Sequence, residues 1–114
     1  MDDCLFCRII DRKIPAKIVY QDDRAVAIED INPHAPTHLL VIPRQHLPSL
    51  LESNTQDEAL LGHLFLVAGH LAHERGLDLK GYRTVINTGA GAGQTVFHLH
   101  VHLLGGRAFH WPPG

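Results

Sequence analysis

One long segment of the chain, residues 54–77, has hydrophobic residues at helical spacing. Drawn as a helix, it has one apolar side, formed by Leu60, Leu64, Val67, Ala68 and Leu71. Thr55 and Glu58 have the spacing of a capping box, and Gly76 stands where a terminating glycine belongs. The pattern therefore predicts one long helix whose apolar side faces a sheet.

Shorter segments have the composition and alternation of strands. Residues 16–30 predict two strands joined by a tight Asp-Asp turn, and 37–43, 81–87 and 95–104 predict one strand each. A short helix is expected near the start, ended by Pro15. Because the strands come in groups without a helix between each pair, the fold predicted is α+β. It has a five-stranded antiparallel sheet, one long helix and a short N-terminal helix, in a single domain over residues 1–114.

The opposite side of the long helix is also unusual, since it combines small residues with large apolar ones. Its members are Gly62, Phe65, Leu66 and Gly69. A surface helix normally carries charged residues on its outer side. The pattern indicates a second packing surface and hence a homodimer; the alternative is a helix covered on both sides by its own chain.

The amino-acid composition argues against several classes of protein. The formal net charge is −2, which argues against a partner that is bulk nucleic acid. The sequence has neither an apolar run long enough to span a membrane nor a signal-peptide pattern, so a cytoplasmic protein is expected. The two cysteines both fall within the first seven residues, which is not a disulfide framework.

Three histidines, His98, His100 and His102, occupy every second position of the segment 95–104. On a strand they share one face, and the other face carries Phe97, Leu99, Val101 and Leu103. The outer two histidines would lie roughly 13 Å apart, too far for all three to bind one metal ion. A histidine-rich solvent edge is the plain alternative, but clustered imidazoles commonly serve proton transfer, nucleophilic attack or metal binding.

A small-residue loop, "NTGAGAGQT", leads directly into these histidines. Glycines let backbone N–H groups approach an anion such as phosphate closely, although such loops are often only turns. Neutral imidazole is a competent nucleophile toward phosphorus near neutral pH. No acidic cluster indicates a magnesium site, so imidazoles and backbone amides would have to balance the phosphate charge.

Four stretches resemble one known family over nearly the whole chain. They are "HLHVHLL", "DINPHAPTHLLVIPRQH", "GYRTVINTGAGAGQTVFHLHVHLLGGR" and the terminal "HWPPG". Together they are similar to the histidine triad family, in its histidine triad nucleotide-binding (Hint) branch. The resemblance implies hydrolysis of purine nucleoside 5′-phosphoramidates through a covalent nucleotidyl-histidine intermediate, with no cofactor required for catalysis. A dinucleoside polyphosphate hydrolase, or a nucleotide-binding interaction module with incidental turnover, are the alternatives.

The resemblance also implies a role for each catalytic histidine. His100 matches the nucleophile, and His102 matches the group that contacts the phosphate and assists the leaving group. His98 matches the residue that orients its neighbours, and His38 the fourth histidine, which supports proton movement. From the residues alone, the alternative for His38 is a strand histidine whose hydrogen bonds are satisfied.

Substrate-binding roles follow from the same resemblance. Asp30 matches the carboxylate that binds the ribose hydroxyls, and the alternative for it is an Asp turn. An apolar slot for the purine would be formed by Ile31, Phe6, Ile9, Ile28 and Leu40, which could also be plain core. The phosphate positions are Asn87, Gly93 and Thr95, the last standing where many relatives have Ser. Trp111 resembles a residue that reaches toward the other subunit's active site, while His34, His73 and His110 are expected on the surface.

The stretch "CLFC" provides Cys4 and Cys7, half of a tetrahedral zinc site. By resemblance to zinc-bearing relatives, His46 and His98 would complete it as a structural site. Two reduced core cysteines are the alternative. A redox pair is a weaker one, because the stretch lacks the βαβ context of such motifs.

Overall fold

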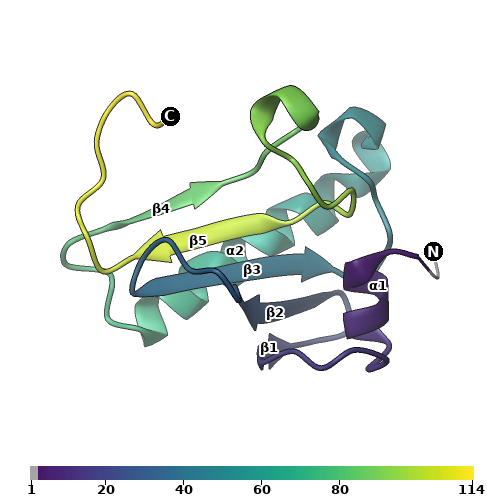
Figure 1. Cartoon of the computed structure of the whole chain (residues 1–114), viewed down its shortest axis with the longest axis horizontal. Coiled ribbons are helices and arrows are strands. Elements are labelled where there is room, and N and C mark those ends of the chain that lie inside the picture. Colours follow the sequence, from purple (N-terminus) through teal and green to yellow (C-terminus); the bar gives the residue numbers. More distant parts are fainter. Residues whose placement is uncertain (1–2) are drawn as a thin grey trace.

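The computed structural model describes residues 3–114, in which five strands form one sheet with a long helix across it (Figure 1). Residues 1 and 2 of the domain expected from the sequence lie outside the described residues. The elements are α1 (Leu5–Ile10), β1 (Ile18–Gln21), β2 (Ala25–Glu29), β3 (Thr37–Pro43), α2 (Glu58–Glu74), β4 (Tyr82–Val85) and β5 (Val101–Gly105). Short 3₁₀ turns lie at Leu50–Glu52, Thr55–Asp57 and Ala90–Ala92.

The strand order is β1-β2-β3-β5-β4, and every neighbouring pair is antiparallel. The last strand of the chain therefore lies between β3 and β4, and its His102 pairs with Leu40 on one side and Val85 on the other. The predicted α+β class, the five antiparallel strands and the two helices are confirmed.

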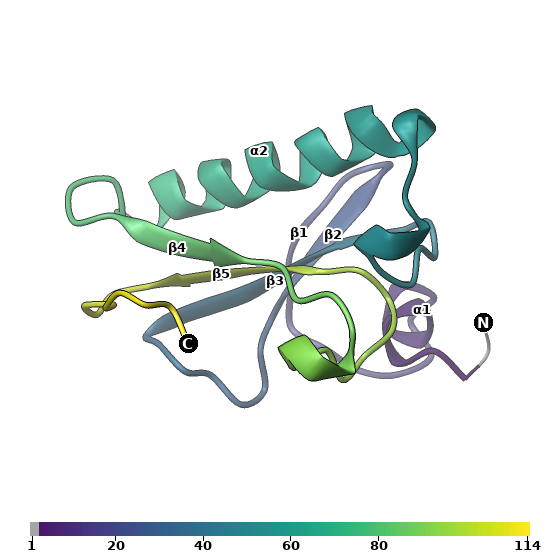
Figure 2. The same cartoon turned by 90° about the horizontal axis from the view of Figure 1, so that it is seen from above.

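The sheet has two differently covered faces. Against one face packs the buried side of α2, formed by Leu64, Val67, Ala68, Leu71 and Ala72, while Leu60 is only half-buried. On the other face, Leu40 and Ile42 pack with Phe6 and Ile9 of α1. Figure 2 shows α2 on one side of the sheet, with α1 and the 87–96 segment on the other. This second face is where the histidines gather.

The helix termini differ in detail from the predicted ones. The capping box is formed by Asn54 and Asp57 rather than by Thr55 and Glu58, because a 3₁₀ turn precedes α2 and shifts the start by one residue. Gly76 has a φ of 72°, the left-handed conformation expected of a terminating glycine. The short helix α1 ends at Ile10, well before Pro15.

The last strand begins later than predicted. Regular pairing starts at Val101, and the N–H of Leu99 donates instead to the carbonyl oxygen of Leu47 at 2.7 Å. Leu99, Val101 and Leu103 belong to the core under α2, as the alternation predicted. Phe97 does not: its side chain is 50% exposed, because the chain bends at 96–98 before it enters the sheet.

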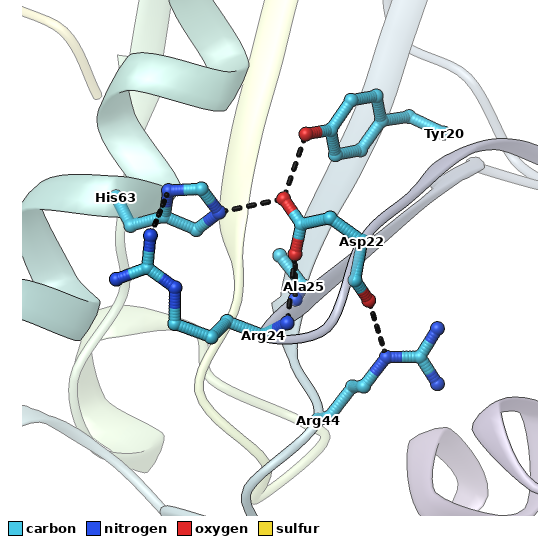
Figure 3. A network of polar contacts seen from close by, with 6 residues as sticks. All are labelled: Tyr20, Asp22, Arg24, Ala25, Arg44 and His63. Atoms are coloured by element: carbon cyan, nitrogen blue, oxygen red, sulfur yellow. Dashed lines mark hydrogen bonds and ion pairs between the residues drawn. The ribbon is translucent and has the colours of Figure 1, made fainter.

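The turn between β1 and β2 is fastened to α2 by the side chain of Asp22 (Figure 3). Its carboxylate accepts hydrogen bonds from Tyr20, from His63 at 2.6 Å, and from the backbone N–H groups of Arg24 and Ala25. Burial alone would raise the pKa of Asp22, but these four donors lower it far below its usual range. His63 is therefore a residue of the helix flank that holds the turn.

The outer side of α2 is not covered by the described chain. Leu66 is 75% exposed and Phe65 43% exposed. Tyr82 of the edge strand β4 is 42% exposed, and a Cβ atom on Gly69 of α2 would lie 3.5 Å from its hydroxyl oxygen. The alternative in which the chain covers both sides of its own helix is therefore wrong. Separately, the part of the chain that the structure describes contains no helix suited to crossing a membrane.

Candidate active site

The structure brings all four predicted catalytic histidines to the sheet face opposite α2. His102 lies on β5, His38 lies on β3, and His98 and His100 lie on the segment that leads into β5. The rings of His100 and His102 are 5.0 Å apart between centroids, and those of His38 and His102 are 5.2 Å apart. His98 is fully buried, whereas His100 and His102 are partly accessible.

The proton of neutral His100 lies on Nδ1. This nitrogen is 2.8 Å from the carbonyl oxygen of His98, and a carbonyl can only accept, so Nδ1–H must donate. Nε2 therefore keeps its lone pair. Edge-on contact with the ring of Phe6, 5.0 Å between centroids, holds the imidazole from the side. His100 is thus a histidine with an oriented, unprotonated nitrogen, which is what nucleophilic attack requires.

A chain of hydrogen bonds fixes the protons of His38 and His102 in the same way. The backbone N–H of His34 donates to Nδ1 of His38 at 3.0 Å, so neutral His38 carries its proton on Nε2. That nitrogen lies 2.9 Å from Nδ1 of His102, which must accept. His102 therefore carries its own proton on Nε2 and presents a donor there.

All four histidines favour the neutral form. Burial is the main cause that lowers the pKa values of His38, His98, His100 and His102 below 6.5. For His102 the pKa falls to about 4, because burial is joined by the neighbouring His100 and His38. The nearby Asp30 carboxylate opposes this shift for His38, His100 and His102. At neutral pH the cluster is uncharged.

These shifts predict a pH dependence of stability. His38 and His102 bind a proton less readily in the folded chain than in the unfolded one, whose histidines titrate near 6.5. Unfolding therefore takes up protons below that pH, and stability falls as pH decreases from 6.5 toward 4, by about 1–3 kcal/mol. Urea unfolding at pH 7 and pH 4.5 measures the loss. His102→Gln should show a smaller loss, and an equal loss in the variant would contradict the assignment to His102.

Asp30 lies at the end of β2, between the histidines and an apolar pocket. Its Oδ1 accepts from the N–H of Asn32 at 2.8 Å, so the Asp turn considered from sequence is present. Its Oδ2 lies 3.3 Å from Nε2 of His38. The two readings of Asp30 are therefore compatible, because one oxygen makes the turn and the other faces the histidines.

The pocket beside Asp30 has a volume of about 240 Å³ and almost entirely apolar walls. All five residues predicted for the purine slot line it: Phe6, Ile9, Ile28, Ile31 and Leu40. Four of them are also core residues, 4–7% exposed, whereas Ile31 is 99% exposed at the rim. Phe6 connects the pocket to the histidine cluster, since its ring also contacts the ring of His100.

The predicted phosphate loop lies on the same side of the sheet as α1 (Figure 2). Gly93 and Thr95 are exposed, and Gly93 has a φ of 93°, which favours glycine. Gln94, which the sequence analysis missed, is 4% exposed and organises the loop. Its side chain accepts from Gly89 N–H and donates to the carbonyl oxygens of Pro48 and Val96. The sequence does contain a sign of this role, because Gln94 is the one long polar side chain among the small residues of the loop 89–95.

Cys4, Cys7, His46 and His98 form a compact cluster between α1 and the sheet. Nδ1 of His98 lies 3.3 Å from Sγ of Cys4, 3.5 Å from Sγ of Cys7 and 3.2 Å from Nδ1 of His46. Around a tetrahedral zinc ion, sulfur and nitrogen ligands are about 3.6 Å apart and two nitrogens about 3.3 Å apart. The spacing of the four ligand atoms therefore fits zinc.

The protonation of this cluster also suits a metal ion. Nε2 of His98 donates to the carbonyl oxygen of Pro43 at 2.8 Å, which leaves a lone pair on Nδ1, the nitrogen that faces the cysteines. Burial raises the pKa of the Cys7 thiol to about 11, and the adjacent Cys4 adds to this effect. The protein alone does not stabilise a thiolate at Cys7, whereas a bound dication displaces the thiol proton.

Asp30, His38 and His102 form a second cluster of metal-ligand type, but its protons do not suit a metal. A metal would need the lone pair of His38 Nε2, and this nitrogen carries the proton as long as His34 N–H donates to Nδ1. From the sequence, His34 was expected only as a surface residue. Its side chain is exposed, but its backbone N–H orders the site.

Trp111, predicted to reach toward the other subunit's site, lies in the segment that follows the last strand. It is 85% exposed in the C-terminal segment that follows β5. Whether it approaches a partner's site stays a prediction. Asn87 is half-buried at the start of the loop 87–96.

The fold and site define an antiparallel α+β protein with a cluster of oriented histidines on one face of its sheet. The HIT domain family profile matches residues 11–109, and the chain belongs to this family. It is 56% identical to an uncharacterized HIT-like protein of Synechococcus elongatus over 113 residues, 99% of this chain and 98% of that protein. The histidine triad resemblance is thereby confirmed at the level of the family.

Solved structures agree with this assignment. A HIT family hydrolase from Legionella pneumophila superimposes with a TM-score of 0.96 at 47% identity, covering 98% of this chain and all of that one. A histidine triad nucleotide-binding protein from Candida albicans has a TM-score of 0.83 at 30% identity, with 96% of this chain and 83% of that one covered.

Proposed function

We propose that this protein hydrolyses purine nucleoside 5′-phosphoramidates through a covalent intermediate on His100. The observation that carries the proposal is the hydrogen bond from Nδ1 of His100 to the carbonyl oxygen of His98, which frees Nε2 for attack. The neutral state of the ring supports the same role, because an imidazolium has no lone pair to donate. The Legionella relative, named a hydrolase, and the Candida relative, named nucleotide-binding, support the class of reaction.

Two steps account for the reaction. In the first, the lone pair of His100 Nε2 forms a bond to phosphorus while the bond from phosphorus to the leaving nitrogen breaks. His102 donates a hydrogen bond from Nε2 to the leaving atom, and that atom takes a proton from water. In the second, water attacks phosphorus, the bond to His100 breaks, and one proton returns to solvent with the nucleoside monophosphate.

The pocket beside Asp30 is proposed to hold the nucleoside. Its apolar walls suit the faces of a purine ring. Asp30 at its edge would offer its carboxylate to the ribose hydroxyls, and Thr95 would offer donors to the phosphate. The N–H of Gly93 already donates to the carbonyl oxygen of Ala90, so Gly93 would contribute a close backbone approach rather than a donor. Asn87 would complete this phosphate site.

Turnover of adenosine 5′-phosphoramidate tests the proposal. Steady-state release of AMP should be observed, and a single-turnover reaction with His102→Ala should leave a nucleotidyl adduct on His100 that mass spectrometry locates. Faster turnover of a diadenosine polyphosphate would instead favour the dinucleoside polyphosphate hydrolase. Tight AMP binding without turnover would favour a nucleotide-binding interaction module.

Replacing Asp30 by Ala should weaken AMP binding by about 1.5–3 kcal/mol, because a charged hydrogen-bond partner of the sugar is lost. Calorimetry with AMP and dAMP measures both the affinity and the preference for ribose, which should disappear. Asp23→Ala, in the turn between β1 and β2, is the matched control and should bind like the parent protein. If Asp30→Ala keeps the preference for ribose, Asp30 does not bind the sugar and its role is limited to stabilising the turn.

A homodimer through α2 and β4 is proposed from the exposed apolar side of the helix. Gly69→Glu would place a charge among Phe65, Leu66 and Tyr82 and should shift the protein toward monomer in sedimentation experiments. His70→Glu adds the same charge at the flank of the helix, where His70 pairs with Glu74 and contacts the Tyr20 ring, and it should remain dimeric. A monomeric parent protein at micromolar concentration would contradict the proposal. In such a dimer, Trp111 could reach the partner's site.

A structural zinc ion held by Cys4, Cys7, His46 and His98 is proposed from the fit of their ligand atoms. When bound, the ion supplies cross-links between α1 and the sheet. The chemistry at His100 requires none of these side chains as reactants. For His98, the ligand is the imidazole, whereas the contact to His100 uses the backbone carbonyl.

A further inference from the structure

The backbone of His34 is held on both sides within the loop that connects β2 to β3. Its N–H donates to Nδ1 of His38, and its carbonyl oxygen accepts from Nε of Arg107 at 2.8 Å. Gly106 packs against the same loop so closely that a Cβ atom there would lie 2.9 Å from Cβ of Pro36. The segment that follows β5 thus restrains the loop at two neighbouring points.

Arg107 is itself restrained. Its guanidinium lies 4.2 Å from the centroid of the Phe109 ring, and its NH1 group donates to the carbonyl oxygen of Ala108 at 2.9 Å. Arg83 of β4 faces the same ring at 5.1 Å and donates to the carbonyl oxygen of His110. Two cations on one aromatic ring restrict where the Arg107 side chain can go.

The His34 N–H and the Asp30 carboxylate both favour a proton on Nε2 of His38, the first by donating to Nδ1 and the second by lying 3.3 Å from Nε2 as an acceptor. Neutral imidazole has one donor and one acceptor. Without the His34 N–H, His38 can carry its proton on Nδ1 and accept from His102 through Nε2. His102 would then carry its proton on Nδ1, toward His38, and would lose the donor at Nε2.

We propose that Arg107 is a positioning residue, which holds the His34 backbone so that His38 directs the proton of His102 to Nε2. Arg107 acts through His34 and His38, not by touching the reacting atoms. The inference rests on the proposed function in one respect, namely that the Nε2 donor of His102 assists the leaving group. The tautomers themselves do not depend on which substrate is hydrolysed.

Nitrogen NMR of protein labelled with ¹⁵N-histidine tests the tautomers directly. In the parent protein at pH 7, His38 and His102 should both show the Nε2–H pattern. In Arg107→Gln, both should shift toward a mixture of tautomers, and in Arg12→Gln, where an exposed arginine elsewhere is lost, neither should. Unchanged tautomers in Arg107→Gln would overturn the proposal.

A second pair of variants separates the His34 backbone from its side chain. His34→Pro removes the N–H donor, whereas His34→Ala keeps it. Only His34→Pro should reproduce the tautomer mixture of Arg107→Gln. A mixture in both variants would assign the effect to the His34 imidazole, whose ring is 5.9 Å from that of His38, and would contradict the role of the backbone.

Kinetics give the functional readout. A hydrogen-bond donor to the leaving atom matters most for a poor leaving group, so kcat/KM for an alkylamine phosphoramidate should fall about tenfold or more in Arg107→Gln. For the 4-nitrophenyl ester of AMP it should fall about twofold at most, because nitrophenolate leaves without a proton. Equal losses with both substrates would indicate a general structural defect and overturn the proposal. Hydrolysis of neither substrate by the parent protein would instead refute the proposed function, while the NMR result would stand.

Discussion

His100→Ala should reduce kcat/KM for adenosine 5′-phosphoramidate by about 10³-fold or more, equivalent to about 4 kcal/mol of transition-state stabilisation. The physical reason is the loss of the oriented nitrogen itself. Neither His98 nor His102 can replace it, because Nδ1 of His98 faces the cysteines and Nε2 of His102 carries a proton. Steady-state kinetics with purified variant measures the effect.

The same variant should keep its affinity for AMP, since Asp30 and the apolar pocket remain. A parallel binding measurement therefore separates lost chemistry from lost folding. His70→Ala, which removes an exposed histidine from α2 on the far side of the sheet, is the matched control and should turn over like the parent. Near-parental turnover by His100→Ala would end the covalent mechanism.

Protein prepared without chelators should contain about one zinc ion per chain, with X-ray absorption distances of about 2.3 Å to sulfur and 2.0–2.1 Å to nitrogen. Structural zinc sites contribute several kcal/mol to folding. For a domain of this size, each kcal/mol lost lowers Tm by about 4 °C, so removing zinc with a chelator should lower Tm by more than about 10 °C.

Cys4→Ser should lower Tm similarly, and the chelator should then have little further effect. The variant should still form the nucleotidyl adduct below its Tm, because the carbonyl oxygen that orients His100 belongs to the backbone of His98. Metal analysis showing no zinc would contradict the proposal and leave Cys4 and Cys7 as reduced cysteines of the core.

The sequence predicted side-chain directions better than backbone partners. The alternation of residues 98–103 correctly placed Leu99, Val101 and Leu103 under α2, since it reports which face each side chain occupies. It did not reveal that the N–H of Leu99 bonds to Leu47 instead of to a strand, so β5 was predicted too long. Nearly every residue type can make a backbone hydrogen bond, so the partner of that bond cannot be inferred from the amino-acid sequence.

The same limit explains what was missed at the site. The residue types lining the pocket and the Cys/His cluster were identified, because apolar, thiol and imidazole side chains indicate their chemistry. The donor that fixes His38 is a backbone N–H, which nearly every residue has, so nothing distinguished His34. The capping box was displaced by one residue because Asn54 and Asp57 satisfy the same spacing as Thr55 and Glu58.

The insertion of β5 between β3 and β4 has a consequence for the order of folding. Until β5 is added, the meander β1-β2-β3 has an unpaired edge and β4 has no neighbour. Cys4 contacts His98, which lies 94 residues further along the chain, and contacts between residues so far apart in sequence form slowly. During synthesis, therefore, a nascent chain that ends before β5 should expose the edge of β3. Neither the cysteine cluster nor the histidine cluster can assemble until the ribosome has released that strand.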